Sequence, residues 1–189
     1  MFIGTNLLNK EIDKKTIYLL LTKPLRRSEF ILGKHIGLSL TLLVIVTMMS
    51  ATFYGLIWFT TGNTPLIYLQ AILLNYVELV LLVSLAILFS TIASPIMSSI
   101  YTLAVYIIGH FSKDLLNFGI MSGNETFIMI TKTIYYVLPD LEKLNVKNIV
   151  LYNPTGLAPD IFTGGIIYGL LYTSVILILA IFNFEFKEF

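Results

Sequence analysis

Long apolar stretches dominate the chain, and each is close to the length of a membrane-spanning helix. A helix needs about 20 predominantly apolar residues to cross the hydrocarbon core of a bilayer. Two of the stretches contain no Asp, Glu, Lys, Arg or His, one contains only Glu78 and one contains only His110. In chain order they are residues 36–60, 66–93, 95–112 and 166–184. The pattern predicts an all-α, polytopic integral membrane helix bundle with four complete transmembrane helices.

Short breaks separate the first three stretches. The sequence "TTGNTP", residues 60–65, is a polar turn, and the second and third stretches meet at Ser94-Pro95. Proline lacks a backbone donor and clashes with a preceding helical turn, so it ends one helix and favours the start of the next. These neighbours are therefore predicted to form antiparallel hairpins.

Residues 113–165, between the third and fourth stretches, are more polar. Within them, apolar residues recur at helical spacing from Asn124 to Leu138, with polar residues between. This pattern predicts an amphipathic helix at the membrane interface, which Pro139 ends. The residues that follow contain many turn formers and predict a loop with at most one short element.

The composition supports a membrane protein. The chain is 57% hydrophobic and only 12% charged, with a mean hydropathy of +0.86, whereas about a quarter of the residues in a soluble domain are charged. It contains no cysteine, which excludes a disulfide framework, a thiolate nucleophile and sulfur-ligated metal sites.

Positive charge is concentrated before the first long apolar stretch. Seven of the twelve Lys and Arg residues lie there: Lys10, Lys14, Lys15, Lys23, Arg26, Arg27 and Lys34. Because Lys and Arg favour the cytoplasmic side of short loops, residues 1–35 and the C-terminal tail are predicted to be cytoplasmic, in the cell (plasma) membrane. Residues 113–165 are then outside.

Residues 1–35 are predicted to form a cytoplasmic helix and an elbow, with residues 1–8 as the end of a preceding span. Pro24 stops the first helix, because the residue before a proline avoids the α region. Ser28 is the predicted N-cap of the next helix, with Glu29 in its first turn. An alternative is a plain basic juxtamembrane stretch that binds anionic lipid and fixes the topology.

Two pairs of glycines are spaced four residues apart near the ends of predicted spans. They are Gly33 with Gly37, and Gly165 with Gly169. Bare backbone at this spacing lets another helix approach closely. Both pairs are predicted packing surfaces.

Three ordered sequences resemble the permeases of the type 2 exporter class of ABC transporters, in the branch known as multi-copper enzyme maturation permeases. They are "KEIDKKTIYLLLTKPLRRSEFILGKHIGL" at residues 10–38, "FSTIASPIMSSIYTLAVYIIGH" at 89–110 and "YYVLPDLEKLNVKN" at 135–148. The family pattern has six spans, so the resemblance implies a permease that is N-terminally shortened.

The resemblance also implies partners and site residues. The first sequence would be the cytoplasmic coupling helix, which contacts a separate ABC ATPase subunit, and a second permease copy would complete a homo- or heterodimer. No nucleic acid partner is implied. The implied ATPase-coupling residues are Glu11, Thr16, Leu20, Leu21, Pro24, Arg27, Gly33 and Lys34.

Catalytic and metal-binding patterns are absent from the sequence. No G-x-x-x-x-G-K-[ST] phosphate-binding loop, H-E-x-x-H or G-x-S-x-G occurs, so ATP hydrolysis is assigned to the partner subunit and no cofactor is expected in this chain. On the predicted topology His35 and His110 fall at opposite membrane surfaces, which disfavours a metal site.

Glu78 is the one acidic residue inside a predicted span. An ionisable side chain there costs at least about 2.5 kcal/mol and is a candidate functional residue. Asn75 lies on the same face, three residues earlier, and is a predicted hydrogen-bond partner. Glu78 either lines the translocation path or a proton-sensitive polar patch, or makes a structural hydrogen bond to a Tyr or Thr of another span.

The function predicted from these observations is a transmembrane permease subunit of an ATP-driven ABC exporter. Two alternatives remain. One is a membrane anchor or assembly subunit that recruits a cytosolic partner without transport. The other is a membrane-embedded enzyme that a partner chain completes.

Overall fold

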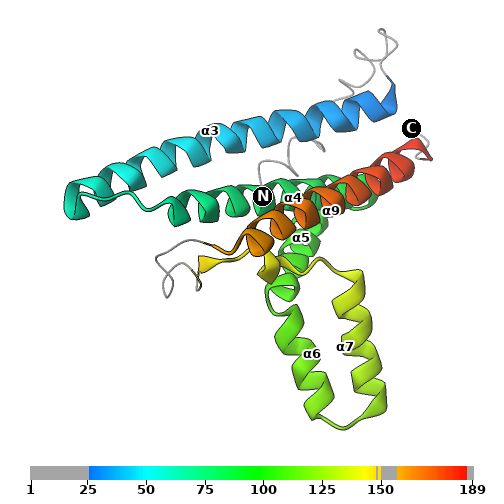
Figure 1. The fold of residues 1–189 in the computed structure, drawn as a ribbon. Coiled ribbons are helices and arrows are strands. Elements are labelled where there is room, and N and C mark those ends of the chain that lie inside the picture. Colours follow the sequence, from blue (N-terminus) through cyan, green and yellow to red (C-terminus); the bar gives the residue numbers. More distant parts are fainter. Residues whose placement is uncertain (1–25, 148, 150–156, 187–189) are drawn as a thin grey trace.

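The computed structural model describes residues 26–147, 149 and 157–186, and this part of the chain is helical, without a strand (Figure 1). The predicted coupling helix lies outside the described residues. The elements are α3 (Arg27–Thr61), α4 (Leu66–Ile92), α5 (Pro95–His110), α6 (Ser112–Met121), α7 (Glu125–Val137), the 3-10 helix η1 (Leu141–Lys143) and α9 (Pro159–Glu185).

Three described helices, α3, α4 and α9, are each long and apolar enough to cross a membrane. The predicted span at residues 95–112 differs, because α5 ends at His110 after only 16 residues. Phe111 leaves the α region, with φ −107° and ψ 10°, and α6 continues at a bend of 62°. The described residues therefore hold three spans, or four if α5 and α6 together form one bent span.

The contact between α4 and α9 forms the centre of the bundle. Helix α4 buries Leu74, Leu81 and Leu85, among other side chains, and α9 lies along it (Figure 1). A Cβ atom at Gly165 would lie 2.8 Å from the Leu74 side chain, and one at Gly169 would overlap the Val77 side chain. The predicted packing role of this glycine pair is confirmed.

Helix α3 is attached to the bundle mainly near its beginning. It is antiparallel to α4, as the polar turn predicts, and ends at Gly62, which adopts φ +69°. Ile31, His35 and Ser39 are its buried residues. Most of its other large apolar side chains are exposed, which suits a surface that faces lipid.

Helices α6 and α7 form a hairpin that extends away from α4 and α9 (Figure 1). A Cβ atom at Gly119 of α6 would overlap the Thr131 side chain of α7, so the glycine permits the close contact. Asn124 caps α7, because its side chain accepts hydrogen bonds from the Thr126 and Phe127 amides. The helix predicted between Asn124 and Leu138 is confirmed.

A buried polar junction joins this hairpin to α9. Asp140, only 5% exposed, accepts a hydrogen bond from the Ser112 hydroxyl at 3.2 Å, and its amide donates to the Tyr168 hydroxyl at 2.8 Å. The Lys143 ammonium lies 3.8 Å from the second Asp140 carboxylate oxygen and 4.8 Å from the centre of the Tyr168 ring. The bend after α5 is therefore fixed to the last span.

The start of α3 differs from the prediction by two residues. Arg26, not Ser28, is the N-cap residue, and the helix begins at Arg27. Glu29 lies in the first turn, as predicted, and its carboxylate accepts a hydrogen bond from the Arg26 amide at 3.1 Å. The Glu29 carboxylate thereby satisfies the backbone N–H of Arg26, which would lie outside the helix if Ser28 were the N-cap residue.

The close α4–α9 contact predicts a position-specific effect of side-chain size. Gly169→Leu is expected to lower the free energy of unfolding in detergent by about 1–3 kcal/mol, because the new side chain overlaps Val77. Gly164 meets no described atom within 4 Å, so Gly164→Leu should change it by less than about 0.5 kcal/mol. Equal effects at the two positions would contradict the packing described here.

Candidate functional site

The beginning of α3 is clamped to the end of α9 by Arg27. The Arg27 guanidinium donates hydrogen bonds to the backbone carbonyl oxygens of Phe184 at 3.2 Å and Glu185 at 2.8 Å. The last carbonyls of a helix have no partner within the helix and carry its partial negative charge. Arg27, from α3, supplies both a hydrogen-bond donor and a positive charge to these carbonyl oxygens of α9.

Apolar contacts reinforce this clamp. The rings of Phe30 and Phe184 stack with their centres 5.9 Å apart. Ile31 is fully buried in a cluster with Ile87 of α4 and Ala180 of α9. The start of α3 and the C-terminal parts of α4 and α9 thus form one packed unit, which we call the elbow junction.

The structure describes three of the eight residues implied to couple to an ATPase. Glu11, Thr16, Leu20, Leu21 and Pro24 lie outside the described residues. Arg27 belongs to the elbow junction, and the Lys34 ammonium lies 5.4 Å from the centre of the Phe30 ring. No described atom comes within 4 Å of a Cβ position at Gly33 or Gly37, so no described helix packs closely on that pair.

Glu78 and His110 form a buried pair between α4 and α5. Glu78 is only 4% exposed, and its Oε1 atom lies 3.4 Å from His110 Nε2. His110 Nδ1 donates to the Tyr106 carbonyl at 3.1 Å, which leaves Nε2 directed at the carboxyl. Among the described residues His110 Nε2 has no hydrogen-bond partner, so its contact with Glu78 is electrostatic rather than a hydrogen bond.

Two further features surround this pair. Among the described residues, Glu78 Oε2 has no hydrogen-bond partner. The positive charge of Lys147, from the segment after η1, also interacts with the Glu78 carboxylate. The predicted hydrogen bond from Asn75 to Glu78 is not formed, because the carboxyl is turned toward α5.

The predicted separation of the two histidines is wrong. His35 Nε2 lies 3.4 Å from the Val80 carbonyl oxygen. His110 contacts Glu78, which precedes Val80 by two residues on α4, so both histidines lie at nearly the same level of that helix. The prediction assumed that the membrane-embedded part of this helix begins after His35. In the structure α3 already begins at Arg27, and His35 lies beside Val80 in the middle part of α4. His35 and Ser39 border a cavity of about 320 Å³ between α3, α4 and α9, with Tyr76 and Leu170.

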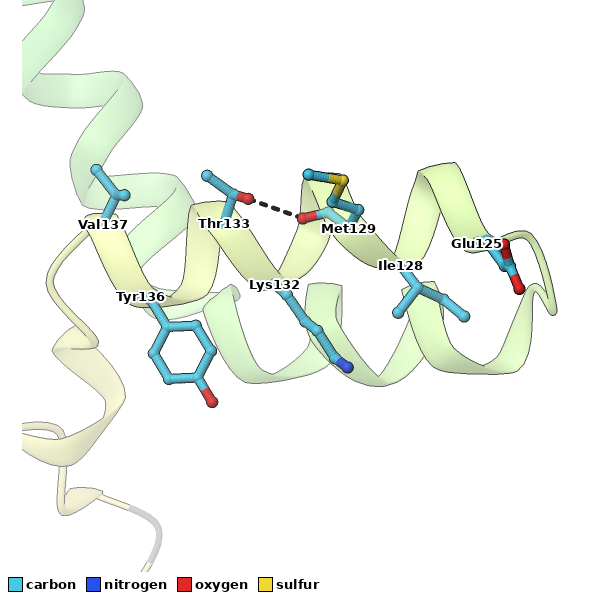
Figure 2. A pocket seen from close by; sticks show the side chains of 7 residues that line it. All are labelled: Glu125, Ile128, Met129, Lys132, Thr133, Tyr136 and Val137. Atoms are coloured by element: carbon cyan, nitrogen blue, oxygen red, sulfur yellow. Dashed lines mark hydrogen bonds between the residues drawn. The ribbon is translucent and has the colours of Figure 1, made fainter.

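The surface of α7 is hollowed but not enclosed. A cavity of about 560 Å³ is lined by Glu125, Ile128, Met129, Lys132, Thr133, Tyr136 and Val137. All seven belong to α7, where their spacing of three and four residues places them along one side of that single helix (Figure 2). With no opposing wall from another element, this hollow is not a candidate ligand site.

Comparison with known proteins identifies the family. The family described as "ABC-2 family transporter protein" matches residues 1–188. The chain belongs to this ABC-2 family. No curated protein and no solved structure matches it significantly.

Membership of the ABC-2 family makes the chain a permease-type membrane component of an ABC transporter, in a family whose ATPase activity lies in separate subunits. Family members generally work with an ABC ATPase and often dimerise. The apolar spans agree with a multi-pass membrane protein. Within the described residues, no group of three or more His, Asp or Glu side chains could hold a metal ion.

The sequence contained a signal for the partner of Glu78 that its interpretation missed. Glu78 lies 16 residues before Ser94, and His110 lies 16 residues after it. In a tight antiparallel hairpin, residues equally distant from the turn lie at the same level. The Ser94–Pro95 turn therefore places the only acidic residue of one helix opposite the only histidine of the next.

The Glu78–His110 pair of this ABC-2 protein predicts measurable coupling. In a double-mutant cycle with Glu78→Gln and His110→Gln, the interaction energy in detergent unfolding should be about 0.5–3 kcal/mol. His35→Gln is the control, because His35 contacts the α4 backbone rather than the Glu78 carboxyl. Additive effects of Glu78→Gln and His110→Gln would show that the two side chains do not interact.

Proposed function

We propose that this ABC-2 protein is the transmembrane permease subunit of an ATP-driven exporter in the plasma membrane. The observation that carries the proposal is the family match over residues 1–188, together with the three or four apolar spans of the described residues. In this proposal residues 1–26 and the C-terminal tail are cytoplasmic. The predicted boundary at residue 35 moves back to the start of α3, because His35 contacts Val80 within the α4 span. The multi-copper enzyme maturation branch and a dimer of permeases remain part of the proposal.

The elbow junction supports a coupling role for the residues before it. A rigid connection is needed if movement of an ATPase subunit is to tilt a membrane helix. Arg27 connects the start of α3 directly to the backbone of α9. The proposed coupling helix, residues 11–23, would therefore displace two spans at once, and Arg27 would transmit the displacement rather than contact the ATPase.

The Glu78–His110 pair supports a polar patch along the translocation path. With the turn at Ser94 on the cytoplasmic side, a rise of 1.5 Å per residue places the pair about 24 Å away from that turn. A hydrocarbon core is about 30 Å thick, so the pair lies in the outer half of the membrane. The pair would form a polar patch there, in an otherwise apolar part of the path.

Co-purification with the cognate ABC ATPase tests this function. Leu20→Asp should reduce recovery of the ATPase, because it places a charge on the proposed contact helix. Arg27→Ala should leave recovery intact but lower permease-stimulated ATP hydrolysis severalfold, because the link to α9 is lost. Arg26→Ala is the matched control, since only the backbone of exposed Arg26 bonds within the cap.

The outcomes separate the proposed function from its alternatives. An ATPase that binds equally well to the Leu20→Asp variant removes the coupling assignment. An ATPase that binds but is never stimulated by the unaltered permease favours the membrane anchor. Loss of binding in Arg27→Ala as well would place Arg27 in the contact itself.

A further inference from the structure

The cavity between α3, α4 and α9 combines an apolar rim with a polar floor. Its volume is about 320 Å³, at the lower end of the roughly 300–1,000 Å³ that ligand pockets occupy. Ile36 and Leu40 of α3 and Leu170 of α9 are about half exposed and form the rim. His35 and Ser39 are buried at the floor. The cavity therefore opens toward lipid and holds its polar groups inside.

Ser39 has a hydroxyl that the described structure does not use. Other hydroxyls of α3 donate back to the carbonyl oxygen four residues earlier, as those of Thr41, Thr47 and Ser50 do. Ser39 is only 9% exposed, and its Oγ atom forms no hydrogen bond among the described residues. A buried donor without a partner is unfavourable, so a bound molecule that accepts from Ser39 would remove this cost.

Two neighbouring side chains supply hydrogen-bond acceptors. His35 Nε2 lies 3.4 Å from the Val80 carbonyl oxygen, which can only accept, so Nε2 carries the proton and Nδ1 of the neutral imidazole is left as an acceptor. The Tyr76 hydroxyl donates to the Ser39 carbonyl oxygen at 3.1 Å, and its own oxygen retains acceptor lone pairs. One donor and two acceptors match a ligand hydroxyl, which both accepts and donates.

The depth of the cavity restricts the ligand to uncharged molecules. Tyr76 lies near the middle of α4, and Leu170 lies near the middle of α9. The floor and the rim share one level, because the floor residue Ser39 and the rim residue Leu40 are neighbours on α3. An ionised group at the centre of a bilayer is costly. The ligand is therefore a neutral molecule that dissolves in the hydrocarbon region.

We propose that this cavity binds a small uncharged alcohol dissolved in the membrane. The ligand hydroxyl accepts a hydrogen bond from Ser39 and donates to His35 Nδ1 or to the Tyr76 oxygen, and its alkyl part lies against Ile36 and Leu170. The inference goes beyond the proposed transport function, because it requires only that the protein lies in a membrane. It does not depend on an ATPase partner or on export.

Photolabelling with an alcohol tests the site. The full chain is placed in phosphatidylcholine nanodiscs with octanol that carries a diazirine on its alkyl chain, and labelled peptides are identified by mass spectrometry. Label should be concentrated on α3 around Ile36 and Leu40 and on α9 around Leu170. Ser39→Ala should reduce this labelling about two- to tenfold, the effect of losing one hydrogen bond.

Matched controls separate the hydroxyl from general effects of substitution. Ser39→Ala breaks no described hydrogen bond, since Tyr76 bonds to the Ser39 backbone, so the fold should be kept. Ser50→Ala removes a hydroxyl of the same helix that already donates to the Val46 carbonyl oxygen, and should leave labelling of the cavity unchanged. Unlabelled octanol should compete with the probe, and octane, which has no hydroxyl, should not.

The proposal fails on any of three results. Equal labelling of the unaltered chain and the Ser39→Ala variant would show that the hydroxyl selects no ligand. Equal competition by octane and octanol would reduce the cavity to an unselective apolar hollow. Label spread evenly over the apolar surfaces of α3 and α9 would show that no alcohol site exists between them.

Discussion

The close packing of α9 on α4 is the interaction on which the rest of the described structure depends. In a bilayer, lipid tails are as apolar as leucine, so helices associate through tight van der Waals contact rather than through the hydrophobic effect. Gly165 and Gly169 bring the backbone of α9 against the side chains of Leu74 and Val77. The α4–α9 pair provides a fixed surface on which α3 and α5, which bury fewer side chains, are held.

Other parts of the chain attach to this pair at two places. At one end, Arg27 and its apolar neighbours hold the start of α3 against the last turn of α9. Nearer the other end, Glu78 holds α5 through His110, and Asp140 links the bend after α5 to Tyr168 of α9. The remaining length of α3 and the α6–α7 hairpin extend from these anchors with much of their apolar surface exposed. A displacement applied at the elbow junction would therefore reach α9 directly.

The sequence predicted those features that depend on neighbouring residues. The length of the nearly uncharged stretches predicted α3, α4 and α9. The turns at Gly62 and Ser94 predicted the ends of α3 and α4, and Asn124 and Pro139 predicted the limits of α7. The sequence did not reveal the break at Phe111, because the span was extended to residue 112 on apolar length alone and Gly109, two residues before the break, was not taken as a signal. The partner of Glu78 required the register of the α4–α5 hairpin, and the role of Arg27 required knowing that a segment 157 residues away ends beside it. The residues before Arg26 carry most of the implied coupling site and stay predictions.

Cross-linking of the elbow junction tests the central claim that the start of α3 and the end of α9 form one unit. The chain has no cysteine, so Phe30→Cys with Phe184→Cys can be joined by a short bismaleimide in native membranes, with Met48→Cys and Phe184→Cys as the distant control. The account predicts efficient intramolecular linking of the first pair, none of the control pair, and no change in linking while the bound ATPase hydrolyses ATP. Failure of the first pair to link, or loss of its linking during hydrolysis, would contradict a rigid elbow junction.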